Sequence, residues 1–320
     1  MTDCAGCAAL LRGWDDILVL CHASPDGDTL GAAGALVRGL RALGKRAWAA
    51  CGDEVGEKYR YLVDGLLAGG ETPAHVLSVD VATPELLGPL EKEYAAAIEL
   101  AIDHHGSHKP FAKESWVDPK AAAACQLLYQ LLKELGAPID KPMADCLYTG
   151  LTTDTGCFRY TNVTPLTHRI AAELLELGAD AGEINRRMFE CKPKAQVEAE
   201  KRILAGMEFF FEGKCAMVQV PQSVYKDTGA QESDLEGVAS LPRQIEGVLM
   251  GVTLKEKEDG KVKASLRSNP PVSACAICEK FGGGGHKYAA GCTFEGASLA
   301  EAAGKITAAV QEHLAGLNLL

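Results

Sequence analysis

Long hydrophobic runs are missing from this 320-residue sequence. Although 47% of its residues are apolar, no run approaches the roughly 18 residues that a membrane-spanning helix needs. The first residues, MTDCAGCAALLRGWDD, also lack the basic and then apolar pattern of a secretory signal. These absences argue against a membrane protein, and we expect a cytoplasmic one.

Positive charge is also scarce. The chain has 32 lysine and arginine residues against 43 aspartate and glutamate residues, which gives a formal net charge of −11. A long nucleic-acid groove needs a positive stripe to replace counterions, so this composition argues against one. Short anionic substrates remain compatible with it, because a few local cations and metal ions can hold them.

A disulfide framework is the third absence. Twelve cysteines are present, but Cys4-x-x-Cys7 and Cys275-x-x-Cys278 lie far apart in the sequence and the others are scattered. In a cytosolic chain of this size, such cysteines are usually free thiols in or near the core. We therefore expect free thiols.

The sequence contains two regions that differ in their pattern of predicted helices and strands, and two domains are expected for a chain of this length. In roughly the first 185 residues, short β-rich runs alternate with segments of helical periodicity that end at glycine. This alternation predicts an α/β fold, with a parallel sheet and helices on both faces. The expected strands are 16–23, 46–51, 75–80 and 96–105, and the clearest helices are 29–44 and 121–136.

The second region follows a charged, helix-forming connector. Residues 164–190 are helical in pattern, and 191–207 continue as a helix after Pro193. Beyond them, the pattern predicts a smaller α+β domain with a hairpin turn at Asp259-Gly260. Its expected strands are 215–221, 246–256 and 261–268, and its expected helices are 273–281 and 298–314. We place the two domains at 1–188 and 208–320, with the connector at 189–207.

Polar side chains are crowded after the first strand, in the stretch HASPDGDTLG. Asp26 or Asp28 could simply cap the following helix. A cap needs only one carboxylate, however, so it does not explain the other aspartate or His22. Ligands bind at the carboxyl ends of strands in parallel α/β sheets, so polar residues there are candidate site residues. The residues that end predicted strands are His22, Asp80, Asp103 and His104.

Asp154, in LTTDTGCFRYTNVTP, adds a carboxylate to this set, although alone it would be interpreted as a turn residue. Carboxylates brought together repel one another and raise their pKa values unless cations neutralise them. Imidazole together with carboxylates suits a divalent ion such as Mn²⁺, and one bridging carboxylate gives a two-metal site. His75 and His108 match no such pattern, and we expect them to be ordinary structural residues.

Five segments together resemble the DHH/DHHA1 phosphoesterase superfamily: HASPDGDTLGAAGAL, SVD, DHHGSH, TDTGCFRYTNVTPLTHRIAAELLELGAD and GGGGHKYAAG. They span nearly the whole chain, and within the superfamily it is most similar to the bifunctional oligoribonuclease and pAp-phosphatase branch, the nanoRNases. The resemblance implies an N-terminal DHH domain with two divalent cations, Mn²⁺ being preferred to Mg²⁺ or Co²⁺. It also implies a smaller DHHA1 domain that holds substrate across a cleft.

The resemblance further implies a role for each residue of the metal site. One ion would be held by His22, Asp26 and Asp80. The other would be held by Asp28, Asp80, His104 and Asp154, which makes Asp80 the bridging ligand. His105 would donate to the oxygens of the scissile phosphate as negative charge builds. Asp103 would lie behind the histidines and accept hydrogen bonds that fix their tautomers.

A second site is expected around KFGGGGHKYAAG. Four consecutive glycines cost backbone entropy, which is reasonable where backbone N–H groups approach an anion closely. His286 and Arg267 would supply charge for a substrate phosphate, and the resemblance implies the same. The residues expected to bind substrate are Arg267, Ser268, Gly283, Gly284, Gly285 and His286, with Arg159 on the metal-bearing side.

Two alternatives concern this second site. The glycines could form a flexible hinge. A zinc site could use Cys275, Cys278, His286 and Cys292, but the first two are expected on a helix and the glycines suit a phosphate better. The chain also departs from the family pattern at Cys157 and at NPPVSAC, where an acidic, glycine-containing segment is usual, and the second departure puts substrate preference in doubt.

The resemblance therefore implies a Mn²⁺-dependent phosphohydrolase for short oligoribonucleotides, dinucleotides such as pApA and 3′-phosphoadenosine 5′-phosphate (pAp). One alternative is a phosphodiesterase for cyclic or linear dinucleotides in second-messenger turnover. Another is a nucleotide-binding regulator with a decayed site, against which the complete set of expected ligands argues. Acidity disfavours an exonuclease for long strands, and GGGGH disfavours an inorganic pyrophosphatase. A homodimer through the α/β domain is compatible with the resemblance.

Overall fold

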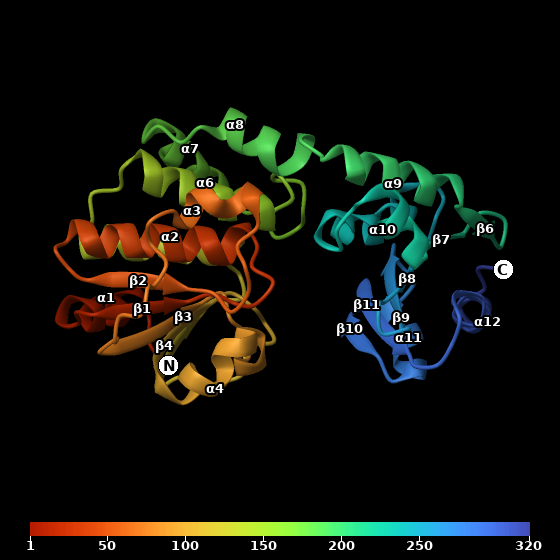
Figure 1. Ribbon diagram of the computed structural model, residues 1–320, viewed down its shortest axis with the longest axis horizontal. Coiled ribbons are helices and arrows are strands. Elements are labelled where there is room, and N and C mark those ends of the chain that lie inside the picture. Colours follow the sequence, from red (N-terminus) through yellow and green to blue (C-terminus); the bar gives the residue numbers. More distant parts are fainter. The chain divides into compact units, whose positions relative to one another are not determined.

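The computed structural model describes residues 1–320, apart from the side chain of Glu236. It divides into two compact units, Met1–Cys191 and Lys192–Leu320, each with its own sheet (Figure 1). Within the described part of the chain, no helix is long and apolar enough to cross a membrane.

The first unit is built on a parallel sheet with the strand order β2-β1-β3-β4-β5. Its strands are β1 (Ile17–Leu20), β2 (Ala47–Ala50), β3 (His75–Val79), β4 (Ile98–Asp103) and β5 (Glu114–Val117). Every residue of β1 is buried, as expected for a parallel strand that is covered on both faces. The chain order reverses between β1 and β3, so a crevice opens at the carboxyl ends of these two strands.

Both faces of this sheet are covered by helical segments. Ile17 and Val19 project into the larger core, whereas Leu18 and Leu20 project into a smaller core on the opposite face. The larger core contains residues of α1 (Cys4–Gly13), α2 (Gly27–Ala42), α5 (Ala124–Leu135) and α6 (Lys141–Asp154). The smaller core is closed by η2 (Pro84–Leu90) and α4 (Glu91–Tyr94). The α/β class predicted from the sequence is confirmed.

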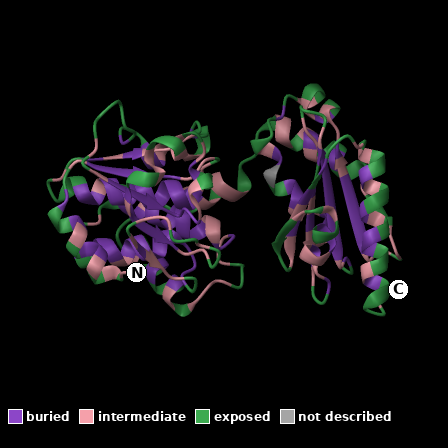
Figure 2. Ribbon diagram, turned by 90° about the horizontal axis from the view of Figure 1, so that it is seen from below, coloured by how far each residue is buried: buried purple, intermediate pink, exposed green. Residues whose placement is uncertain are grey.

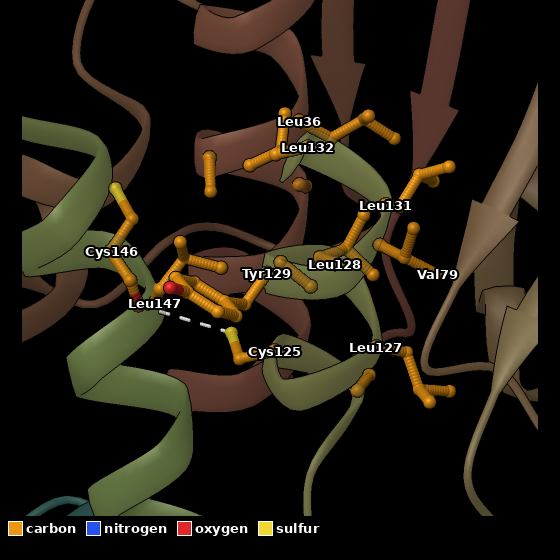
Figure 3. Packing of buried hydrophobic residues seen from close by; sticks show 14 of the residues in the cluster. Leu36, Val79, Cys125, Leu127, Leu128, Tyr129, Leu131, Leu132, Cys146 and Leu147 are labelled. Carbon is orange, nitrogen blue, oxygen red and sulfur yellow. Dashed lines mark hydrogen bonds between the residues drawn. The ribbon is translucent and has the colours of Figure 1, made fainter. Parts of the chain in front are cut away.

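Helices α2 and α6 pack closely because glycine occupies their contact. A Cβ atom on Gly31 would lie 2.4 Å from the carbonyl oxygen of Cys146, so any larger residue would push the helices apart. Figure 3 shows the neighbouring core, where the thiol of Cys125 donates to the same carbonyl at 3.9 Å. This packing fixes the first turn of α2 relative to the end of α6, and both positions carry predicted site residues.

The remaining helical segments of the first unit are short or lie at its end. They are η1 (Glu57–Tyr59), α3 (Arg60–Val63), η3 (Ala95–Ala97), α7 (Pro165–Glu176), α8 (Ala181–Asn185) and a π-helical turn, η4 (Arg186–Glu190). Helix α7 begins with a capping box, in which Thr164 and Thr167 bond each other's backbone N–H groups, followed by Pro165 at its first position.

The second unit contains a mixed sheet with the order β10-β11-β9-β8-β7-β6. Its neighbouring strands are antiparallel except β7 and β8, which are parallel. The strands are β6 (Glu208–Phe210), β7 (Cys215–Val220), β8 (Met250–Glu256), β9 (Val262–Ser268), β10 (Gly284–His286) and β11 (Ala289–Phe294). Figure 2 shows the strands of this sheet mostly buried beneath helices with exposed outer faces.

Helices cover the second sheet on both faces. One face packs against α9 (Lys194–Ala205), α10 (Gln222–Thr228) and the 3₁₀ segments η5 (Ser233–Ser240) and η6 (Pro242–Gln244). The other packs against α11 (Ala274–Cys278), η7 (Glu279–Phe281) and α12 (Leu299–Gly316). The segment expected to be a connector, α9, begins after Pro193 and buries Ala199 and Ile203 in the core of this second unit.

Some elements differ from those that the sequence predicted. The glycine stretch was expected to be a loop, but Gly284–His286 pair with β11 as an edge strand. Helices α1 and α6 and strands β5, β6 and β11 were not predicted. Strand β5 is short and only Ser115 in it is buried, so its pattern carries little signal.

Candidate metal centre

His22 and Asp26 lie in the loop between β1 and α2. The ring of His22 is oriented by a 2.8 Å hydrogen bond from Nδ1–H to the carbonyl oxygen of Ala23. Its Nε2 is then directed at two carboxylates, 3.7 Å from Asp26 Oδ1 and 3.6 Å from Asp80 Oδ2. Asp26 also caps α2 by accepting bonds from the backbone N–H groups of Asp28 and Thr29. The cap and the candidate ligand are therefore the same residue.

Asp80 lies at the carboxyl end of β3, in the middle of the cluster. Its backbone has a φ of 60°, in the left-handed region that is uncommon for a residue with a side chain, and this side chain is only 3% exposed. Oδ2 faces His22, and Oδ1 lies 3.4 Å from His104 Nε2. Oδ1 is buried and receives no hydrogen bond from the described residues. A buried carboxylate oxygen without a donor is costly unless a cation completes it.

His104 joins Asp80 to two further carboxylates. Its Nδ1–H donates to the carbonyl oxygen of Ala121, which leaves Nε2 directed at Asp154 Oδ2 at 3.2 Å and Asp28 Oδ2 at 3.7 Å. Asp28 is fully buried, and its carboxylate accepts bonds from the first backbone N–H groups of α5. Asp154 is the last residue of α6. Residues from four elements of the first unit thus meet at one point.

Electrostatics show that the cluster contains too little positive charge. Burial lowers the pKa of His22 and of His104, but the adjacent aspartates outweigh it and raise these values to about 11 and about 12. Burial, and then the charge of Asp80 and other neighbours, raises the pKa of Asp28 well above its ordinary value. Burial likewise raises the pKa of Asp154. A cation bound beside Asp28 and Asp154 would oppose this rise, because it favours the charged form of both carboxylates.

The donor atoms suit divalent cations. They form three overlapping groups, each within 4.8 Å: His22 with Asp26 and Asp80, Asp28 with His104 and Asp154, and Asp80 with His104 and His105. Two ligands about 2.1 Å from one ion lie about 3.0–3.4 Å apart at octahedral or tetrahedral angles, close to the separations seen here. Both histidines also use Nδ1–H on a backbone carbonyl, which leaves Nε2 free to coordinate.

Behind this cluster, the buried carboxylate of Asp103 holds two imidazole rings. Oδ1 accepts from His105 Nδ1–H at 2.8 Å, and Oδ2 accepts from His108 Nδ1–H at 2.7 Å. Oδ1 also accepts from the backbone N–H of His104, whose ring is held by Ala121 instead. The bond to Asp103 raises the pKa of His105, so its ring favours the charged form.

The sequence analysis did not connect His108 with Asp103. Its side chain is only 5% exposed, and its Nε2 is buried with no hydrogen-bond partner among the residues described. Only the bond to Asp103 could have indicated a role, and that depends on the folded position of the chain. His75, in contrast, bonds Glu99 and stacks on Trp14, away from the cluster.

The segment after Asp154 turns with unusual backbone geometry. Gly156, Cys157 and Phe158 all have positive φ, near 60°, so three successive residues are left-handed. The position singled out in the sequence, Cys157, therefore carries backbone strain. Arg159 donates from Nε to the carbonyl oxygen of Gly156, so this nitrogen bonds the turn and not the cluster.

The other predicted substrate-binding residues lie in the second unit. Arg267 is in β9, and Gly284, Gly285 and His286 form β10. Gly283 precedes this strand and needs to be glycine, because a Cβ there would lie 2.2 Å from the carbonyl oxygen of Gly291. Ser268 is 1% exposed and its hydroxyl donates to the carbonyl oxygen of Val272, so the structure does not bring this hydroxyl to the surface beside Arg267.

The cysteines expected as free thiols are all free. The alternative zinc site is not assembled, since no donor group within the described residues combines Cys275, Cys278, His286 and Cys292. The thiol of Cys275 instead donates to the carbonyl oxygen of Gly285 at 3.1 Å and to Glu279 at 3.3 Å.

Comparisons with known proteins match both units. Residues 16–151 match the model of the DHH family, N-terminal domain, and residues 213–315 match that of the DHHA1 domain. Over 305 residues the chain is 35% identical to the bifunctional oligoribonuclease and PAP phosphatase NrnA of Thermus thermophilus, covering 93% of this chain and 90% of that protein.

Two solved structures show the same fold. An exopolyphosphatase-related protein from Bacteroides fragilis has a TM-score of 0.90 at 22% identity, over 98% of this chain and 97% of that one. RecJ from Thermus thermophilus, in complex with Mn²⁺, has a TM-score of 0.56 at 19% identity, over 96% of this chain and 55% of that one.

Proposed function

This chain belongs to the DHH family, with a DHH domain followed by a DHHA1 domain, and on that premise we propose that it is a metal-dependent phosphohydrolase of short nucleotides. The family predicted from the sequence is confirmed. The proposed substrates are oligoribonucleotides of a few residues, including dinucleotides such as pApA, and pAp. The name of the Thermus relative, which the chain matches over most of both lengths, gives an oligoribonuclease and a PAP phosphatase.

The observation that carries this proposal is two adjacent donor groups, one containing Asp80 and the other containing His104, whose Nε2 lies 3.4 Å from Asp80 Oδ1. We assign two divalent cations to them, with Mn²⁺ preferred, since imidazole and carboxylate ligands suit that ion. His22, Asp26 and Asp80 would hold one, and Asp28, Asp80, His104 and Asp154 would hold the other. When bound, the ions supply Lewis acidity, which lowers the pKa of water and neutralises charge on phosphoryl oxygens.

His105 is the proposed catalytic residue next to these ligands. Its Nδ1–H is engaged by Asp103, which raises the pKa of the ring and so favours the form in which Nε2–H can donate to a phosphate oxygen. Negative charge grows on those oxygens as the ester bond breaks, so this hydrogen bond strengthens in the transition state. Asp103 is a positioning residue in this scheme, because it acts through the imidazole.

The second unit would bind the substrate rather than react with it. Arg267 of β9 carries a guanidinium group, which suits bidentate contacts to phosphate, and the imidazole of His286 in β10 can donate a hydrogen bond to it. The acidic composition of the chain agrees with substrates of a few nucleotides, because no continuous basic stripe is needed for them.

A panel of substrates tests the proposal. Purified protein is incubated with oligoribonucleotides of one to ten residues, with pAp and with linear and cyclic dinucleotides, in Mn²⁺, in Mg²⁺ or with a chelator. We expect mononucleotide release from the shortest oligomers and phosphate release from pAp, fastest in Mn²⁺ and abolished by the chelator. Cleavage confined to cyclic dinucleotides would support the second-messenger alternative. Tight binding without turnover would indicate a regulator and overturn the proposal.

A further inference from the structure

The register of the second sheet aligns basic residues in one row. His286 of β10 is opposite Ala289 of β11, Ala289 is opposite Arg267 of β9, and Arg267 is opposite Gly251 of β8. Directly opposed residues of antiparallel strands project from the same face of a sheet. His286 and Arg267 therefore project from the face on which Gly251 has no side chain, and the small Ala289 separates them.

A second arginine, Arg243, lies in η6, which packs on this face at Gly251. A Cβ atom built on Gly251 would lie 2.6 Å from the backbone nitrogen of Arg243, so η6 packs directly on this glycine. Two other residues of β8 that share this face, Thr253 and Lys255, donate to carbonyl oxygens of η5, which shows that η5 and η6 cover β8 here. Arg243 is thereby held next to Arg267.

Asn269 fixes this arrangement from the end of β9. Its Nδ2 donates to the carbonyl oxygen of Arg243 at 3.3 Å and to that of Val248 at 2.9 Å. The backbone that carries Arg243 is thus tied to the residue two positions after Arg267. Strand β9 itself alternates buried and more exposed residues, and Arg267 is only partly buried on the face beside η6.

Neither arginine has a counter-charge. The described residues include no carboxylate within 4.0 Å of the guanidinium of Arg243 or Arg267. The hydrogen bond from Arg267 goes to the carbonyl oxygen of Leu266, next to it in the chain. Burial, and then the positive charge of Arg243, lowers the pKa of Arg267. Two partly buried like charges without an anion destabilise each other, and a bound anion would reverse this.

We infer that Arg243 is a further substrate-binding residue, which forms with Arg267 a subsite for a phosphate monoester at one end of the nucleotide. A terminal phosphate carries up to two negative charges, and two adjacent guanidinium groups can each donate two hydrogen bonds to it. This inference rests on the proposed function, because it assigns the phosphate that pApA has and ApA lacks.

The test compares ligands that differ only in this phosphate. Wild type, Arg243→Gln and Arg243→Lys are assayed with pApA and ApA in Mn²⁺, and their binding of AMP and adenosine is measured by calorimetry on the full chain in Mn²⁺. We expect Arg243→Gln to raise the KM for pApA and the Kd for AMP about tenfold, with little change for ApA or adenosine. Arg243→Lys should recover part of the difference, since it keeps the charge but not the fork.

Arg202→Gln is the matched control, because this arginine of α9 is already paired with Glu198 and Asp227. It should leave the preference for the terminal phosphate unchanged. The thermal midpoint separates binding from packing. Arg243→Gln removes a repulsive charge, so it should not lower the midpoint, whereas loss of a structural residue would.

The outcomes distinguish this inference from the proposed function. If wild type hydrolyses the dinucleotides and Arg243→Gln keeps the wild-type preference for pApA and AMP, the subsite is wrong and the function stands. If wild type hydrolyses neither dinucleotide, the proposed function fails, and the AMP and adenosine titrations still decide whether Arg243 binds phosphate. A lowered midpoint with an unchanged preference would also overturn the inference.

Discussion

The two units concentrate charge of opposite sign, and they assemble it by different routes. In the first, aspartates from three segments of the chain converge: Asp26 and Asp28 at the start of α2, Asp80 after β3, and Asp154 at the end of α6. In the second, Arg267 and His286 project from one face of antiparallel strands, and Arg243 lies in η6, which packs on that face. Each cluster lacks its counter-charge, which is costly in the folded protein. In each unit, the sign of the charge that neighbouring residues do not neutralise predicts the ligand. This is a cation for the first cluster and a phosphate for the second.

The largest expected effect comes from changing Asp80, which is the proposed ligand of both cations. Asp80→Asn should lower kcat/KM for a dinucleotide in Mn²⁺ by about a thousandfold or more, since a neutral amide cannot bridge two cations. Asp64→Asn, an exposed aspartate of the same unit, is the control and should keep full activity.

Stability measurements sharpen this test. The carboxylate of Asp80 lies 3.6 Å from His22 Nε2 and 3.4 Å from His104 Nε2 and contributes to their raised pKa values, so Asp80→Asn removes one counter-charge of both rings. Its thermal midpoint in chelator should therefore be lower than that of wild type near neutral pH, and the difference should shrink as the pH rises. Substantial turnover with a normal metal content would contradict the assignment of Asp80.

Chelation should reveal the missing positive charge of the first cluster. Histidine in an unfolded chain has a pKa of about 6.5, whereas His22 and His104 have raised pKa values of about 11 and about 12. Such groups stabilise the fold fully below pH 6.5, and this stability is lost as the pH rises toward the folded values. The thermal midpoint in chelator should therefore fall between pH 6.5 and pH 9.

Manganese should oppose this loss, because deprotonated ligands bind it better. We expect Mn²⁺ to raise the midpoint by roughly 5–10 °C at pH 7.5, and by more at pH 9 than at pH 6.5. Differential scanning fluorimetry measures this, with Asp80→Asn as the control that should respond weakly. If the increase in thermal midpoint caused by Mn²⁺ became smaller as the pH rises, the assignment of the first cluster as a cation site would be contradicted.

Substitutions of Arg267, on the basic face of the second sheet, should affect substrate binding more than the rate of the chemical step. Arg267→Gln is expected to raise KM for pApA and pAp by about tenfold or more, because it removes charged hydrogen bonds to phosphate, while kcat changes less. Steady-state kinetics on both substrates measure the two constants. An unchanged KM on both would remove Arg267 from the substrate site.

The smallest effect is expected one residue further along β9. The hydroxyl of Ser268 is buried and donates to Val272, so Ser268→Ala should cost about 1 kcal/mol of stability and leave KM within about twofold. Chemical denaturation and the same kinetic assay measure both values. A large rise in KM with unchanged stability would instead support the substrate role expected from the sequence.

Much of the first cluster could be predicted from the sequence, because the rule that ligands bind at the carboxyl ends of parallel strands needs only the order of the elements. It placed His22, Asp80 and His104 together, and they do meet. The rule could not show that Asp26 also caps α2, or that the rings are oriented by Ala23 and Ala121, since those bonds depend on loop conformation.

The second unit was harder to predict for a physical reason. Four glycines have no side-chain pattern, so only pairing with β11 could reveal that three residues ending at His286 form a strand. Arg243 lies far from Arg267 in sequence, and the close packing of η6 on Gly251 appears only in three dimensions. His108 shows the same limit. The sequence analysis singled out Asp103, but the hydrogen bond between Asp103 and His108 depends on the folded chain.

Separate hydrophobic cores have a consequence for cooperativity. The apolar clusters of Met1–Cys191 and of Lys192–Leu320 share no residue, so heat need not melt this chain in one step. Calorimetry is expected to resolve two endotherms. Manganese would shift one of them and a nucleoside monophosphate the other, and each ligand would thereby identify the half of the chain that it holds together.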